Sequence, residues 1–137
     1  MEKEFVPYEQ SLALKELGFD EICFAHYCNG DLITKTAILK SSTMLYYQQN
    51  NINPNNQYKH QNCTTPLYQQ AFRWFREKCG CEFHIECRRH TSVKYYEVFL
   101  FDGNKNSMIF GKSLKYEEAE LECLKKLIEI IKKWKKH

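Results

Sequence analysis

Two amphipathic helices bracket three strand-like segments in the second half of the chain. The predicted helices cover Pro66–Cys79 and Tyr116–Lys133, and each repeats apolar residues at the spacing of one helical face. Such apolar stripes must be buried, and the strands between the helices are the nearest surface to cover them. The order therefore predicts an α+β fold in which the helices pack on one face of an antiparallel sheet.

The three strand-like segments differ in their patterns. Cys81–Arg89 alternates apolar and polar residues, as a half-buried strand does, and Ser107–Lys112 closes the predicted meander. Val93–Phe101 is apolar or aromatic on both faces. If the helices cover the face with Tyr96, Val98 and Leu100, the opposite face still needs cover, either from the N-terminal part of this chain or from another molecule. The residues of that second face are the candidate contact surface: Tyr95, Phe99 and Phe101.

The first forty residues predict a helix followed by a hairpin. Pro7 and Gly18 delimit a helix over about Pro7–Leu17, and Asn29-Gly30 forms a turn between Glu21–Cys28 and Leu32–Leu39. Residues 41–64 are interpreted as a surface loop, since ten of the fifteen residues from Gln48 to Asn62 are Asn or Gln. The whole chain, 1–137, is predicted to be a single domain, with helix and hairpin in 1–40 and helix, three strands and helix in 65–137.

Composition limits the class of protein. A chain of 137 residues, 43% hydrophobic, can bury a core without disulfide or metal support, and its net charge of +3 is too mild to indicate nucleic-acid binding. The N-terminus lacks the pattern of a signal peptide, and no apolar run is long enough for a membrane span. We expect a cytoplasmic protein, without membrane attachment, whose seven cysteines are reduced.

Metal binding is the first chemistry to test, because Cys79, Cys81, His84, Cys87 and His90 lie within twelve residues. Zinc needs donors that converge on one point. Strand alternation places Cys81 and Cys87 opposite His84 and His90, so no zinc site is predicted there. His26 and Cys28 share one face of a predicted strand, but two ligands make only half of a zinc site.

Catalytic signatures are also missing from the sequence. Cys81, Cys87 and Cys123 fall on predicted core faces, where thiols are inert, and Cys63 near His60 lies in the loop. GxSxG, HExxH and phosphate-loop motifs are absent. We predict a protein that is not an enzyme and that has no cofactor and no metal.

Double-stranded RNA binding is the alternative function, since helix, three strands, helix is also the topology of the double-stranded RNA-binding domain. That family opens its second helix with lysines that grip phosphates. Here Glu117, Glu118 and Glu120 occupy the equivalent turn and would repel phosphates. The C-terminal lysines are interpreted as a solvated face that complements the helix dipole, although they could dock an acidic partner, a membrane surface or nucleic acid.

The helical segments carry a family resemblance. They read PYEQ at Pro7–Gln10, LKELGFDE at Leu14–Glu21, PLYQQAFRWFREK at Pro66–Lys78 and YEEAELECLKKLIEI at Tyr116–Ile130. The chain resembles a widespread family of small proteins from gut Bacteroides-type bacteria, their phages and prophages. The resemblance implies no catalytic residue. It implies no established activity, but a phage context makes binding to a host defence or regulatory protein in the host cytoplasm a natural hypothesis. The small size, the lack of enzyme motifs and the spare aromatic face of the sheet motivate it, and self-association through that face is also expected.

Overall fold

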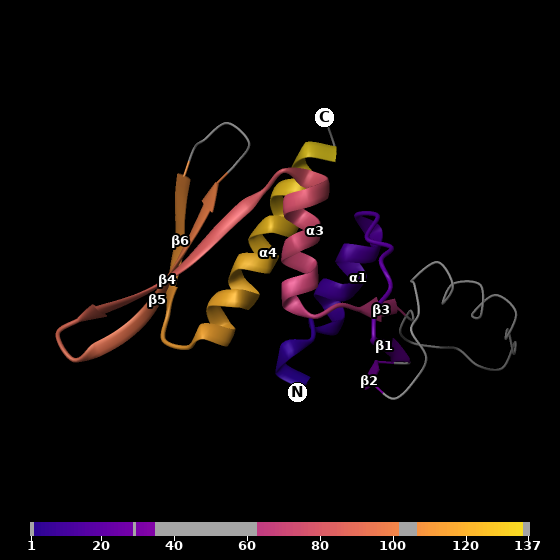
Figure 1. Cartoon of the computed structure of the whole chain (residues 1–137), viewed down its shortest axis with the longest axis horizontal. Helices are drawn as coiled ribbons and strands as arrows, with labels where there is room; N and C mark the ends of the chain where they lie inside the picture. Colours follow the sequence, from indigo (N-terminus) through magenta and orange to yellow (C-terminus); the bar gives the residue numbers. More distant parts are fainter. Residues whose placement is uncertain (1, 29, 35–62, 102–106, 136–137) are drawn as a thin grey trace, which may run out of the picture. The chain divides into compact units, whose positions relative to one another are not determined.

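The computed structural model describes residues 2–28, 30–34, 63–101 and 107–135 (Figure 1). The chain divides into two compact units, Met1–Gln69 and Gln70–His137, and the boundary falls in the first turn of a helix. The described residues form three α-helices and two antiparallel three-stranded sheets. The α+β class is thereby confirmed, whereas the single-domain organisation stays a prediction.

The first unit combines one α-helix with a small sheet of order β2-β1-β3. Helix α1 is slightly shorter than predicted, because Pro7 is its N-cap and Leu17 its C-cap. Gly18 then adopts a φ of 99°, which glycine reaches without steric cost. The elements of this unit are a short 3-10 helix Glu2–Glu4, α1 Tyr8–Glu16, β1 Ala25–Cys28, β2 Asp31–Ile33 and β3 Cys63–Thr65.

Strand β3 corrects the predicted loop and the predicted start of the following helix. It pairs antiparallel with β1, with Tyr27 opposite Cys63 and Ala25 opposite Thr65, and all three of its residues are buried. The end of the loop 41–64 is therefore a strand, while 41–62 lies outside the described residues. The helix begins at Tyr68 rather than Pro66, because β3 and the bridge between Leu67 and Phe5 hold the preceding residues extended.

The backbone carbonyl of Val6 connects several elements of the first unit through hydrogen bonds. The Val6 oxygen accepts hydrogen bonds from three hydroxyls, Thr65 Oγ1 at 2.7 Å, Tyr27 Oη at 3.0 Å and Ser11 Oγ at 3.1 Å. The Val6 amide donates to the Pro66 carbonyl at 3.0 Å. Val6 and its donors are buried, so each bond also removes the cost of an unsatisfied polar group.

The second unit is the predicted meander between two helices. Its sheet has the order β4-β5-β6 and is antiparallel throughout. The strands lie within one or two residues of their predicted bounds, because alternation and turn residues mark them clearly in the sequence. The elements are α3 Tyr68–Cys79, β4 Glu82–His90, β5 Val93–Phe101, β6 Ser107–Ser113 and α4 Tyr116–Lys135.

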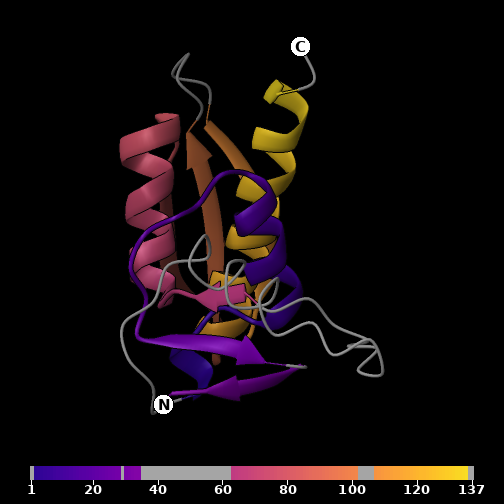
Figure 2. The ribbon, with the colours of Figure 1, turned by 90° about the vertical axis from the view of Figure 1, so that its right-hand side faces the viewer.

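Both helices of this unit cover the same face of the sheet, which we call the inner face (Figure 2). On the α3 side, the ring of Phe72 lies 4.2 Å from that of Phe83. On the α4 side, the ring of Tyr96 meets Tyr116 edge to face at 5.6 Å. The predicted apolar stripe of α4 is buried as expected: Ala119, Cys123, Leu124, Leu127, Ile128 and Ile131. The prediction of helices on one side of the sheet is confirmed.

A bulge at Gly111 changes which face the end of β6 presents. Val98 pairs with Phe110, but its neighbour Glu97 pairs with Lys112, so Gly111 is an extra residue in β6. Its φ of 61° is a left-handed conformation that favours glycine, and a Cβ there would meet nothing within 4 Å. The bulge moves Lys112 from the inner face, where strict alternation would place it, to the side of Glu97.

Candidate binding face of the second sheet

The outer face of the second sheet is the side opposite α3 and α4. The strand register shows which residues share it, because directly paired residues point to the same side: Glu82 with Phe101, His84 with Phe99, Glu86 and Lys112 with Glu97, and Arg88 with Tyr95. All three residues of the predicted contact surface therefore lie together. Phe101 is 39% exposed, whereas Tyr95 and Phe99 are half-buried.

Paired charges form the centre of the outer face. The Arg88 guanidinium lies 2.8 Å from Glu86 Oε2 through Nη2 and 3.2 Å from Glu97 Oε2 through Nε. The hydrogen bond to Glu86, together with the charges of Glu86 and Glu97, raises the pKa of Arg88. Lys112 Nζ lies 3.9 Å from Glu97 Oε1 on the other side. Glu97 is buried between two cations, which is the arrangement that a buried carboxylate requires.

The cations also lie over the aromatic rings. Arg88 lies 5.8 Å from the centroid of Phe99, and Lys112 lies 5.3 Å from that of Tyr95. The His84 imidazole lies 5.9 Å from the Phe99 ring. Sequence reasoning found the rings but missed these partners. The signal for Arg88 and His84 was the polar side of the alternating β4 pattern, and the signal for Lys112 was a glycine inside a strand pattern, which indicates a bulge.

The β4–β5 hairpin continues past the helices, as Figure 1 shows at the lower left. Every residue from Cys87 to Lys94 is exposed. The prediction that Cys87 lies in the core is therefore wrong: it has the inner-face parity, but α3 and α4 do not reach it. The turn places Thr91 at a φ of 56°, a strained conformation for a β-branched residue.

The cysteines of the structure are all free thiols. Burial raises the pKa of Cys23 and Cys63 to about 11 and that of Cys123 to about 12, so these three are poor nucleophiles. Cys81 is buried, whereas His84 and His90 are exposed on the outer face. In the part of the chain that the structure describes, His, Cys, Asp and Glu side chains form no group of three that could hold a metal ion.

The first turn of α4 is less acidic at its surface than the sequence predicts. Glu120 is buried, and its pKa is raised by desolvation and by the charge of Glu117. Only Glu117 and Glu118 of the predicted three carboxylates remain exposed. At the other end of α4, Lys126 and Lys133 each lie 3.2 Å from Glu129, which places part of the lysine-rich segment in exposed ion pairs.

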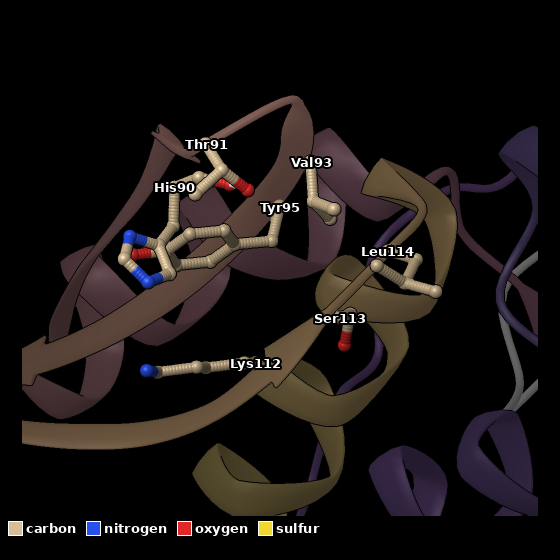
Figure 3. Close-up of a pocket in the computed structure, with 7 residues that line it drawn as sticks. All are labelled: His90, Thr91, Val93, Tyr95, Lys112, Ser113 and Leu114. Carbon is tan, nitrogen blue, oxygen red and sulfur yellow. Dashed lines mark hydrogen bonds between the residues drawn. The ribbon is translucent and has the colours of Figure 1, made fainter.

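A hollow of about 630 Å³ adjoins the outer face at the base of the projecting turn (Figure 3). The end of β4 and the turn contribute His90 and Thr91, while β5, the end of β6 and the residue that follows β6 contribute the other walls. Val93 is 49% exposed and Leu114 is 70% exposed, so two apolar side chains of the hollow are open to solvent. The complete lining is His90, Thr91, Val93, Tyr95, Lys112, Ser113 and Leu114.

The comparisons give no relative for this arrangement: no family model, curated protein or solved structure matches the chain. Across the described residues, none of the helices combines the length and the apolar character needed to span a membrane.

Proposed function

We propose that the chain is a small non-enzymatic accessory protein that acts by binding another protein through the outer face of the β4–β5–β6 sheet. The observation that carries the proposal is the combination of exposed and half-buried aromatic rings with paired charges on one face. Tyr95, Phe99 and Phe101 supply apolar contact area, while Arg88 and Lys112 lie over two of these rings. Aromatic residues and arginine are the types enriched at the centres of protein interfaces.

The resemblance to small proteins of Bacteroides-type phages and prophages extends the proposal to a host protein as partner, such as a defence or regulatory protein. The argument for a binding role rests on the residues of the sheet face. Paired residues of β4, β5 and β6 share this surface, and Arg88 and Lys112 lie against Glu86 and Glu97. Pairing offsets part of the cost that arises when a partner removes water from these charges.

The test is capture from the lysate of a Bacteroides-type gut bacterium with three immobilised proteins. The wild type is compared with the double variant Phe99→Ala/Phe101→Ala and with Trp134→Ala, which removes an exposed aromatic ring from α4 instead. We expect a protein that the wild type and Trp134→Ala retain and the double variant loses. Equal retention by all three proteins, or no specific capture together with a monomeric protein in sedimentation, contradicts the proposal.

Duplex RNA is the second candidate, and a specific observation favours it. The projecting hairpin exposes Arg88, Arg89, His90 and Lys94 on a unit with the helix, three strands, helix topology. Phosphate contacts make binding strongly dependent on salt. The measurement is the mobility shift of a 20-base-pair duplex at about 50 mM and about 200 mM salt. A complex seen only at the lower salt supports RNA binding, and its absence at both removes this candidate.

A further inference from the structure

We propose that the hollow beside the hairpin turn binds an acidic stretch of extended polypeptide, with an apolar side chain between Val93 and Leu114 and a neighbouring carboxylate on Lys112. This inference deepens the proposed function by naming the chemistry of the partner, and it rests on that function. It is carried by three features of the hollow: its apolar walls, the absence of carboxylates from its described lining and the placement of Lys112 on the outer face.

The apolar walls make the hollow suited to a hydrophobic side chain. Val93 and Leu114 are about half and more than two thirds exposed, and both line the same depression with the ring of Tyr95 (Figure 3). Covering such surface is favourable in proportion to the apolar area removed from water. The volume of about 630 Å³ far exceeds that of one side chain, so a short segment of chain fits rather than a single residue.

The charge around the hollow selects an acidic segment. Among the residues that the structure describes, the lining of the hollow contains one lysine, Lys112, and one histidine, His90, but no carboxylate. The carboxylates at the centre of the outer face, Glu86 and Glu97, both lie against Arg88. The carboxylates of the first turn of α4, Glu117 and Glu118, belong to the helix that covers the inner face. A polypeptide rich in Asp or Glu is therefore attracted here, and a basic one is repelled. Among the cations of the neighbouring hairpin, Arg88 shares the outer face, whereas Arg89 and Lys94 pair with each other on the inner-face side.

Lys112 is the cation best placed to receive a carboxylate. Its side chain is 67% exposed, and its 3.9 Å contact with Glu97 is too long for a strong hydrogen bond, so its ammonium can donate to a ligand. The Gly111 bulge sets Lys112 on the outer face, and the ring of Tyr95 lies 5.3 Å from its ammonium. The bulge thus sets the side of the sheet from which Lys112 extends, next to the hollow that it lines.

The experiment selects ligands from a display library of random 12-residue peptides against the full chain. We expect enriched peptides to place Asp or Glu next to Leu, Ile, Val or Phe. The strongest peptide is then synthesised, and its affinity is measured by fluorescence anisotropy with the wild type and four variants. Lys112→Glu and Leu114→Ser change the hollow, Lys112→Arg keeps its charge, and Lys132→Glu makes the same charge reversal at an exposed position of α4.

The expected pattern is at least a tenfold loss of affinity with Lys112→Glu and with Leu114→Ser. Affinity should stay within about threefold for Lys112→Arg and Lys132→Glu, because these keep the charge and the walls of the hollow. Circular dichroism of each variant establishes that a loss of affinity is not a loss of folding. Enrichment of basic or neutral peptides, a library with no enrichment, or equal binding by Lys112→Glu overturns the inference.

Failure here is distinguishable from failure of the proposed function. If the lysate partner is retained through Phe99 and Phe101 but the library yields no acidic peptide, only the occupant of the hollow is wrong. If duplex RNA binds the chain and Lys112→Glu abolishes that binding while no acidic peptide is selected, the hollow serves nucleic acid, and the acidic-peptide inference is also overturned.

Discussion

The two faces of the β4–β5–β6 sheet carry similar numbers of rings but use them differently. On the inner face, Phe83 and Tyr96 meet rings of α3 and α4, and Val98 between them is buried. On the outer face, Phe99 and Tyr95 meet the cations of Arg88 and Lys112. The inner rings are held by packing against apolar atoms, whereas the outer rings are held by charges that remain in contact with water.

Because of this difference, some residues of β5 contribute to the stability of the fold, and their neighbours in the same strand are open to a binding partner. Successive residues of β5 point to opposite sides, so neighbours such as Val98 and Phe99 belong to environments with different physical demands. Inner residues that the helices cover, such as Val98 and Leu100, are buried, so their volume must fit the core. Outer residues need only keep their charges paired, which leaves their rings available to a partner.

The largest expected effect is on the inner face. Phe72→Ala removes a fully buried ring that packs on Phe83, so we expect a loss of about 3–5 kcal/mol in the free energy of unfolding. Phe99→Ala, the matched change on the outer face, should cost roughly 1 kcal/mol, because its ring is only half-buried. Urea denaturation measures both, and equal losses would break the distinction between the faces.

The reactivity of the cysteine thiols tests how far along the strands the helices cover the inner face. Burial raises the pKa of Cys23 and Cys63 to about 11, so at pH 8 only roughly one thiol in a thousand is ionised. Cys87, exposed on the hairpin, should react with iodoacetamide much faster than these two and faster than Cys123. Peptide mass spectrometry of timed samples gives the order, and early modification of Cys123 would show that α4 does not protect its side of the sheet.

Glu97 tests whether the outer face depends on its charges. Glu97→Ala removes the carboxylate that lies between Arg88 and Lys112, and we expect a loss of about 1 kcal/mol in stability, since both cations stay partly hydrated. Glu129→Gln on α4 removes an exposed carboxylate with two lysine partners and should leave the denaturation midpoint unchanged. A larger effect at Glu129 would mean that surface pairs, rather than the outer-face network, matter.

A stabilising change is expected at the hairpin turn. Thr91→Gly relieves the left-handed backbone of a β-branched residue, and after the entropy cost of glycine the net gain is about 0.5–1 kcal/mol. Thr91→Ala keeps a Cβ and should give little or no gain. Thermal denaturation compares the two variants, and a destabilised Thr91→Gly protein would show that the turn stores no strain.

The smallest effect concerns a carboxylate buried on the inner side of α4. Desolvation raises the pKa of Glu120, so the folded state favours its protonated form. The stability linked to this group is complete below the ordinary pKa of 4.5 and is lost as the pH rises through the folded value. Glu120→Gln should therefore raise the melting temperature at pH 7 but not at pH 3.5. Glu122→Gln, at an exposed position of the same helix, is the control.

The sequence predicts the second unit much better than the first. In α3, α4 and the meander, the apolar period and the turn residues act locally, so each element can be recognised by itself. Strand β3 has three residues, Cys63, Thr64 and Thr65, and its partner β1 lies far away in the sequence. A strand this short has no measurable alternation, and its pairing depends on tertiary contacts that no local pattern contains.

The candidate site, too, could be predicted only where it depends on a local sequence pattern. Alternation in β5 is sufficient to place Tyr95, Phe99 and Phe101 on one face, but it says nothing of how far the helices extend along the strands. Cys87 is exposed for that reason, although its parity is correct. The position of Lys112 depends on one bulge residue, Gly111, and Lys112 is one of the residues that line the hollow. Small departures from regular geometry thus determine the site, while regular geometry determines the fold.

The carbonyl of Val6 has a consequence for how the protein is made. Its hydroxyl donors Tyr27 and Thr65 follow it by 21 and 59 residues, so the ribosome must deliver Thr65 before the first unit can complete its polar core. Until then the Val6 carbonyl lacks one of its three hydroxyl donors. Contacts of such long sequence separation also slow folding. The first unit is therefore synthesised first, yet its polar core is completed only when synthesis reaches the start of the second unit.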